Sequence, residues 1–151
     1  MSDILEELSA VRRRDAELRQ QQVSLAEMMA RAEAAEGAPD FAAAFSGPGT
    51  HVIAELKKAS PSCGLIRADF DPLPLARELA QAGAAALSVL CEPHRFLGSE
   101  DYLRAARAEV AIPVLYKDFV TTPYQVAAAR AAGASAVLLI AAVLEDRKSV
   151  V

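Results

Sequence analysis

The sequence predicts an α/β protein built on a parallel sheet, and two patterns support this. From position 51 onward, short apolar runs bounded by turn residues alternate with helical stretches at a spacing of about 25 residues. Residues 81–90 are echoed fifty positions later by residues 131–140. In both segments a helix ends, a glycine supplies a left-handed cap and a buried strand begins. We therefore expect four strands.

The first element is a helical segment over residues 3–35, because apolar side chains recur at helical spacing near its start. Its second piece, residues 25–35, follows Ser24. The spacing from Ser24 to Glu27 matches a capping box, in which each side chain satisfies a free N–H of the first turn.

A glycine- and proline-containing break at residues 46–50 separates these helices from the first strand. We therefore expect a helical extension over residues 1–47 and a sheet-forming part over residues 48–151. The expected strands are 51–56, 85–90, 111–115 and 136–140, and the helices between them are 74–82, 100–109 and 124–132.

Four βα units fit either an open doubly wound sheet or half of an eight-unit barrel. The length of 151 residues favours the open sheet, because a complete barrel usually takes about 250 residues. The glycine-rich dinucleotide fingerprint that often follows the first strand of an open sheet is missing from the sequence. The side chains at the strand ends decide between the two.

Glu55 and Lys57 share one face of the first strand, since successive strand side chains alternate. Ionised groups at the end of a buried strand are costly unless they pair or face water. They form either a structural ion pair or the lining of a pocket. Lys117 places a second amine at the end of the third strand, on the face of Leu115 and Phe119.

Two lysines at the carboxyl ends of parallel strands fit a barrel, where those ends form one rim and carry the active site. A lysine there can hold an anionic substrate or act as a general acid. Residues 60–64 look like an ordinary turn, and Phe96 like a packed loop aromatic that could also cover a flat ligand. His51 and His94 are expected to be structural.

Composition excludes several classes of protein. The chain is 53% hydrophobic and 24% charged, as in soluble globular proteins, and no apolar run reaches the roughly 18 residues of a membrane span. A net charge of −4 and 5% aromatic residues argue against a nucleic-acid partner. No secretion signal is evident, so we expect a cytoplasmic protein in which Cys63 and Cys91 are reduced thiols without metal-ligand spacing.

Several motifs, taken together, resemble the indole-3-glycerol phosphate synthase family. The most specific is the first-strand segment 53–62, IAELKKASPS, followed by GLIR at 64–67 and FDP at 70–72. The resemblance continues through AAALSVL at 84–90, FLGS at 96–99, PVLYKDF at 113–119 and GASAVLLIAA at 133–142.

The resemblance implies a (β/α)8 TIM barrel, of which this chain carries the first four βα units and the helical extension. It also implies the substrate 1-(2-carboxyphenylamino)-1-deoxyribulose 5-phosphate, a phosphorylated small molecule. The family closes an indole ring with loss of CO2 and water, as a carbon–carbon lyase of tryptophan biosynthesis. No metal and no organic cofactor are implied.

By the same resemblance, Lys117 corresponds to the general acid of ring closure. Lys57 corresponds to a lysine that binds the substrate carboxylate and serves a later proton transfer. Glu55 matches a glutamate that positions this site, and Ser60 belongs to the same motif. The residues matching the apolar lining of the anthranilate ring are Leu90, Phe96, Phe119 and Leu138.

The family barrel needs four further strands, which carry the rest of its catalytic and phosphate-binding residues. We therefore expect this chain by itself to be inactive or to self-associate through exposed barrel edges. A catalytically incomplete half barrel that acts only through association is the alternative function. A barrel like phosphoribosylanthranilate isomerase is a weaker alternative, because the motifs around Glu55 and Lys117 count against it. The terminal residues 145–151 read as a helix start or a non-native tail.

Overall fold

In the computed structural model, which describes residues 4–144, the centre of the chain is a four-stranded parallel sheet. Its strands are β1 (Ile53–Leu56), β4 (Ala86–Leu90), β5 (Val114–Lys117) and β6 (Ala136–Val137), in the order β1-β4-β5-β6. Each strand of this sheet lies beside its predecessor in the sequence. A doubly wound sheet instead reverses its strand order at a switch point.

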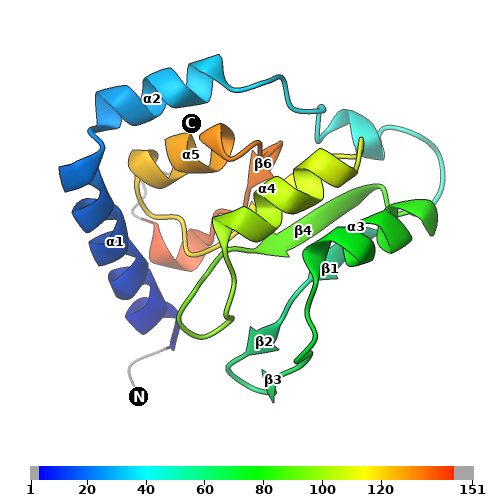
Figure 1. Cartoon of the computed structure of the whole chain (residues 1–151), viewed down its shortest axis with the longest axis horizontal. Coiled ribbons are helices and arrows are strands. Elements are labelled where there is room, and N and C mark those ends of the chain that lie inside the picture. The colour runs from blue at the N-terminus through cyan, green and yellow to red at the C-terminus, as the bar shows by residue number, and fades with distance from the viewer. Residues whose placement is uncertain (1–3, 145–151) are drawn as a thin grey trace.

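Three helices cover one face of this sheet: α3 (Pro72–Gln81), α4 (Glu100–Glu109) and α5 (Pro123–Ala131) (Figure 1). All three contribute side chains to one core cluster with the strands, which includes Leu87, Val89, Val114, Tyr116, Ala76, Leu103 and Ala129. Covering on one face and sequential strand order are the features of a barrel wall. These features confirm the interpretation as part of a barrel and count against an open doubly wound sheet.

The helices begin where side chains can satisfy the free N–H groups of their first turns. Asp71, Ser99 and Thr122 cap α3, α4 and α5, and Thr122 forms a reciprocal capping box with Gln125. The glycines that close the two echoed segments, Gly83 and Gly133, have φ angles of 94° and 97°. Their predicted left-handed conformation is confirmed.

The N-terminal helices are α1 (Ile4–Gln22) and α2 (Leu25–Ala34), which run along the side of the sheet at α5 (Figure 1). The Ser24 hydroxyl accepts the Glu27 N–H at 3.2 Å, which is one half of the expected capping box, whereas the Glu27 carboxylate accepts a hydrogen bond from Arg31. Met28 of α2 packs against Tyr124 and Ala128 of α5 in a second, smaller core. Residue 3, placed in this helix by the sequence, lies outside the described residues.

The third strand was expected over 111–115 but runs over Val114–Lys117, and two further elements differ from the sequence expectation. The segment expected to be a plain turn forms a short hairpin of β2 (Ala59–Ser60) and β3 (Gly64–Leu65), because the Ser60 hydroxyl accepts the Cys63 N–H and tightens the reversal. The fourth strand of the main sheet was expected over 136–140, but only Ala136–Val137 pair with β5. This strand lies at the sheet edge, where a single neighbour supplies its hydrogen bonds.

The remaining elements are two 3-10 turns, η1 (Ala43–Phe45) and η2 (Ala141–Val143). The expectation for residues 145–151 falls outside the described part of the chain. Among residues 4–144, the helices are all too short or too polar to cross a bilayer.

Candidate active site

The charged centre of the site is a single carboxylate that contacts two amines. The Lys57 ammonium lies 2.8 Å from Oε1 of Glu55, and the Lys117 ammonium donates a hydrogen bond to Oε2. β1 supplies Glu55 and leads into Lys57, whereas Lys117 ends β5 two strands away. The three side chains meet at the carboxyl ends of the strands, on the face opposite to the helices.

The charge state of Glu55 follows from this contact. Partial burial by itself would raise the Glu55 pKa, but hydrogen bonds and charge from Lys117 and Lys57 outweigh burial and lower the pKa below its usual value. Glu55 is therefore an anion at neutral pH. The ion pair expected at the end of the first strand is present, and the paired groups remain partly exposed at the rim. The lining of a pocket by Glu55 and Lys57 stays a prediction.

An aromatic pair lies beside this charged centre. The ring centroids of Phe96 and Phe119 are 6.3 Å apart, and both residues follow strand ends. Leu90 is buried at the end of β4 and is the register partner of Lys117. The structure thus brings the apolar candidates from β4 and β5 to the same rim as the lysines.

Ser60 and Leu138 are the two remaining candidates. Ser60 is buried in the β2–β3 hairpin, and the preceding residue, Ala59, donates its N–H to the Phe96 carbonyl at 3.2 Å. This bond joins the loop after β1 to the loop after β4. Leu138 follows β6, one strand beyond β5, and its N–H donates to the Tyr116 carbonyl.

The residues expected to be inert take structural positions. His51 packs edge-on against Phe45 and hydrogen-bonds the Gly47 carbonyl at 2.9 Å. His94 contacts Asp15 of α1 at 2.7 Å. Cys63 is exposed, Cys91 is buried, and both are free thiols.

A second polar cluster, which the sequence did not reveal, ties α1 to the end of β5. Arg12 of α1 donates to both carboxylate oxygens of Asp118, with Nη2–Oδ2 at 2.6 Å, and the Tyr116 hydroxyl donates to the same carboxylate at 3.1 Å. Asp118 directly follows Lys117, and its side chain is fully buried. The N-terminal helix therefore holds the strand end that presents Lys117.

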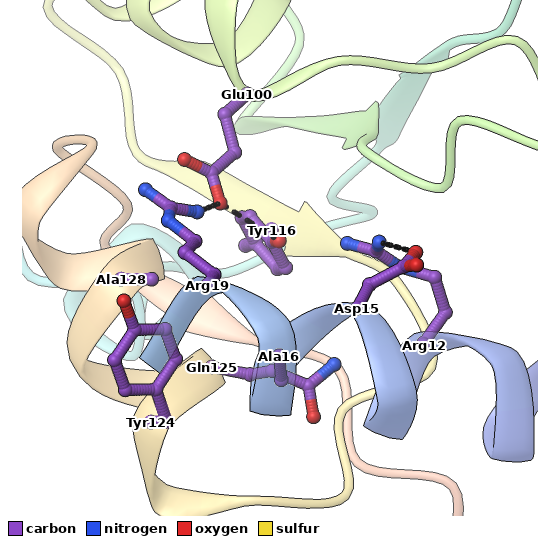
Figure 2. Close-up of a pocket in the computed structure, with 9 residues that line it drawn as sticks. All are labelled: Arg12, Asp15, Ala16, Arg19, Glu100, Tyr116, Tyr124, Gln125 and Ala128. Atoms are coloured by element: carbon purple, nitrogen blue, oxygen red, sulfur yellow. Dashed lines mark hydrogen bonds and ion pairs between the residues drawn. The ribbon is translucent and has the colours of Figure 1, made fainter. Parts of the chain in front are cut away.

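Figure 2 shows the neighbouring part of this cluster, where Arg19 of α1 reaches Glu100 at 2.6 Å and Arg12 reaches Asp15. Burial and the Asp118 charge raise the pKa of Tyr116, so its hydroxyl stays protonated and remains a donor. The charge-rich stretch of α1 is thus partly an interface. Its partners lie about a hundred residues away in the sequence, for example Asp118 at a separation of 106, and no local pattern signals them.

Helices cover only one face of the parallel sheet, and the carboxyl ends of its strands carry a carboxylate that contacts two amines. These features define the chain as part of an eight-unit βα barrel, a class of protein that carries its active sites at the carboxyl ends of the strands. A family model described as indole-3-glycerol phosphate synthase matches residues 5–150. The chain belongs to the indole-3-glycerol phosphate synthase family.

Curated relatives give the same result. The chain is 49% identical over 150 residues to the indole-3-glycerol phosphate synthase of Rhizorhabdus wittichii, covering 97% of this chain and 57% of that protein. The proteins of that name from Rhodospirillum rubrum and Mycolicibacterium gilvum are 48% and 52% identical, over 97% and 89% of this chain. The chain spans about half the length of these relatives, 57% and 49% respectively.

The Glu55 contacts predict a specific pH dependence of stability. Because the folded-state pKa of Glu55 is lowered, its contribution is complete above the unfolded value near 4.5 and is lost as pH falls through the lower folded value. Urea unfolding of Glu55→Gln should therefore show a shallower loss of stability on acidification below about pH 4.5 than the parent chain. Asp69→Asn, at a side chain that is 82% exposed, is the control and should leave the slope unchanged. Equal slopes for Glu55→Gln and the parent would contradict this assignment.

The Arg12–Asp118 contact predicts a large loss of stability when it is broken. Asp118→Ala leaves the mostly buried Arg12 guanidinium without its partner, which costs about 3–5 kcal/mol of unfolding free energy. Glu27→Gln breaks the exposed Glu27–Arg31 pair and should cost no more than about 1 kcal/mol. Denaturant unfolding of both variants measures the difference. Similar losses of unfolding free energy in the two variants would show that the docking of α1 does not depend on the Arg12–Asp118 contact.

Proposed function

We propose that this chain supplies the lysine–glutamate part of an indole-3-glycerol phosphate synthase active site. The observation that supports the proposal most directly is the Glu55 carboxylate, which contacts Lys57 and Lys117 from two different strands. Family membership connects this cluster to a reaction. The substrate is 1-(2-carboxyphenylamino)-1-deoxyribulose 5-phosphate.

The reaction makes three demands on the protein. The ketone oxygen needs a proton donor as the aromatic ring carbon attacks the ketone carbon. The anthranilate carboxylate needs a cation until it leaves as CO2. The flat ring needs an apolar slot that holds the reacting carbons together, since orientation removes much of the entropic barrier.

Residues at one rim are suited to each of these demands. Lys117 is the general acid that protonates the ketone oxygen. Lys57 binds the substrate carboxylate, and it serves the later proton transfer. Glu55 orients both ammonium groups, so that neither must be reorganised when charge develops in the transition state.

The aromatic pair provides the slot. Phe96 and Phe119 offer ring faces and edges to the anthranilate ring, with Leu90 at the end of β4, Leu138 just after β6 and Ser60 at the hairpin. Exclusion of water by these side chains lowers the local dielectric and strengthens the lysine contacts with the anionic substrate.

Turnover of this substrate, followed through indole fluorescence, tests the assignment on the purified 151-residue chain. Lys117→Ala should lower the rate by about 10²–10⁴-fold, the usual contribution of a general acid. Lys58→Ala is the matched control, because Lys58 is adjacent to the site in sequence but lies outside the Glu55 cluster. Equal loss in both variants would overturn the role of Lys117. A folded chain without turnover would instead favour the second candidate.

The second candidate is a half barrel that acts through association, here with a second copy of itself. Apolar side chains on and next to the edge strands β1 and β6 lie in solvent, with Val52 55%, Ile53 45% and Leu139 48% exposed. Two copies related by a two-fold axis would pair β6 of each with β1 of the other. This arrangement gives the eight parallel strands of a closed barrel and removes all four edges.

Sedimentation over a range of concentrations tests this association. The parent chain should form dimers, and lysine at the edge positions, Val52→Lys or Leu139→Lys, should shift the equilibrium to monomer by introducing charge into the strand pairing. Leu18→Lys, at an α1 position that is 51% exposed, is the control and should leave the dimer intact. A parent chain that stays monomeric would reject the candidate.

A further inference from the structure

Glu92 is a fully buried acid that lies two residues beyond β4, in the loop that leads to α4. The reaction scheme above gives it no role. Among the residues that the structure describes, Glu92 forms no ion pair with a cationic side chain, unlike the other buried acid, Asp118. Burial of an unpaired carboxylate costs several kcal/mol, so its contacts must compensate locally.

Those contacts are backbone N–H groups of its own loop. Oε1 of Glu92 accepts the N–H of His94 at 2.7 Å, and Oε2 accepts the N–H groups of Arg95 and Phe96 at 2.7 and 2.8 Å. The Glu92 carbonyl accepts the Gly98 N–H at 2.7 Å. The loop is therefore folded around one side chain that satisfies three donors with two oxygens.

The backbone after Phe96 is strained and closely packed. Leu97 has a φ of 51°, a region that a leucine rarely adopts. A Cβ at Gly98 would lie 2.3 Å from the Leu90 carbonyl oxygen, so only glycine fits there. His94, Arg95 and Leu97 are nonetheless exposed, and the loop adds little to the core. Such strain persists only where the surroundings determine the conformation, and it is concentrated at functional sites.

The residue that this loop places is Phe96. Its ring lies against Phe119, and its carbonyl accepts the N–H of Ala59 beside Ser60. We propose that Glu92 is a positioning residue that holds Phe96 over the aromatic slot and so sets the preference for a flat aromatic substrate. The part of this proposal that concerns the substrate rests on the proposed function.

The substitution Glu92→Gln separates this role from simple packing. Glutamine keeps the volume but has one acceptor oxygen, so either His94 or the Arg95–Phe96 pair loses its acceptor. Glu92→Asp, which keeps the charge but shortens its reach, is a second variant in case the first does not fold. Asp101→Asn, at an exposed acid in the first turn of α4, is the matched control.

Amide hydrogen exchange on the 151-residue chain is the first readout, because it needs no ligand. Glu92→Gln should speed exchange at residues 94–96 by about tenfold or more, as expected for loss of a charge-assisted hydrogen bond, and should weaken the nuclear Overhauser contacts between Phe96 and Phe119. Asp101→Asn should change neither. Unchanged exchange and unchanged ring contacts in a folded Glu92 variant would overturn the proposal.

Titration with anthranilate is the second readout. Glu92→Gln should weaken binding about tenfold, and the double variant with Phe96→Ala should bind no more weakly than Phe96→Ala, because Glu92 acts through Phe96. Additive losses would overturn the proposal. A parent chain that does not bind anthranilate would reject the aromatic slot of the proposed function, while hydrogen exchange and the ring contacts still decide whether Glu92 positions Phe96.

Discussion

The contact between Glu55 and two lysines depends on the order and register of three strands. β4 lies between β1 and β5, so Glu55 and Lys117 must reach across it from either side, a span of about 9–10 Å between the outer strands. The register places Ser88 directly beside Glu55, and Ser88 has one of the smallest side chains on this face of β4. A larger side chain at Ser88 would separate the carboxylate from the Lys117 amine. The contact of Glu55 with both lysines therefore depends on the strand order and on the small side chain of Ser88 between the outer strands.

The opposite side of β5 carries the second constraint. Lys117 points to the open face, and the next side chain, Asp118, is held on the other side by Arg12 of the N-terminal helix. Buried ion pairs contribute little net stability when compared with well-packed apolar residues, and their stronger effect is to select one arrangement. Here the arrangement selected is the docking of α1 beside the residue proposed as the general acid. Because the Arg12 guanidinium is mostly buried, a conformation that leaves it without a partner would cost more free energy.

The loops at the rim connect these two constraints. The loop after β4 is fixed from within by Glu92, and its outer side chains reach α1, where His94 contacts Asp15 and Arg95 contacts Glu7. The same loop accepts the Ala59 N–H from the hairpin after β1. The loops that carry Phe96 and Ser60 are therefore joined to each other and to the helical extension. On the other side of the rim, the open face and the two edge strands remain exposed, which is the basis for expecting an associating partner.

The sequence by itself determined the α/β class, the four parallel strands, the helix caps at Ser24, Gly83 and Gly133, and the positions of Glu55, Lys57 and Lys117 at strand ends. These features arise from local patterns, because side-chain alternation along a strand and the residue types that cap a helix act over a few neighbouring positions. Residue motifs added the family resemblance, and the match over residues 5–150 confirmed it.

Only the tertiary structure decided which of these residues meet. The bridging by Glu55, the Arg12–Asp118 contact and the hairpin bond to Phe96 each join segments that lie at least 37 residues apart, as from Ala59 to Phe96. The Glu92 contacts are local, but a glutamate in a loop is ordinarily solvated, and only its complete burial shows that the loop folds around it. The fourth strand was predicted too long for a related reason, since an apolar run forms a strand only as far as a neighbouring strand pairs with it.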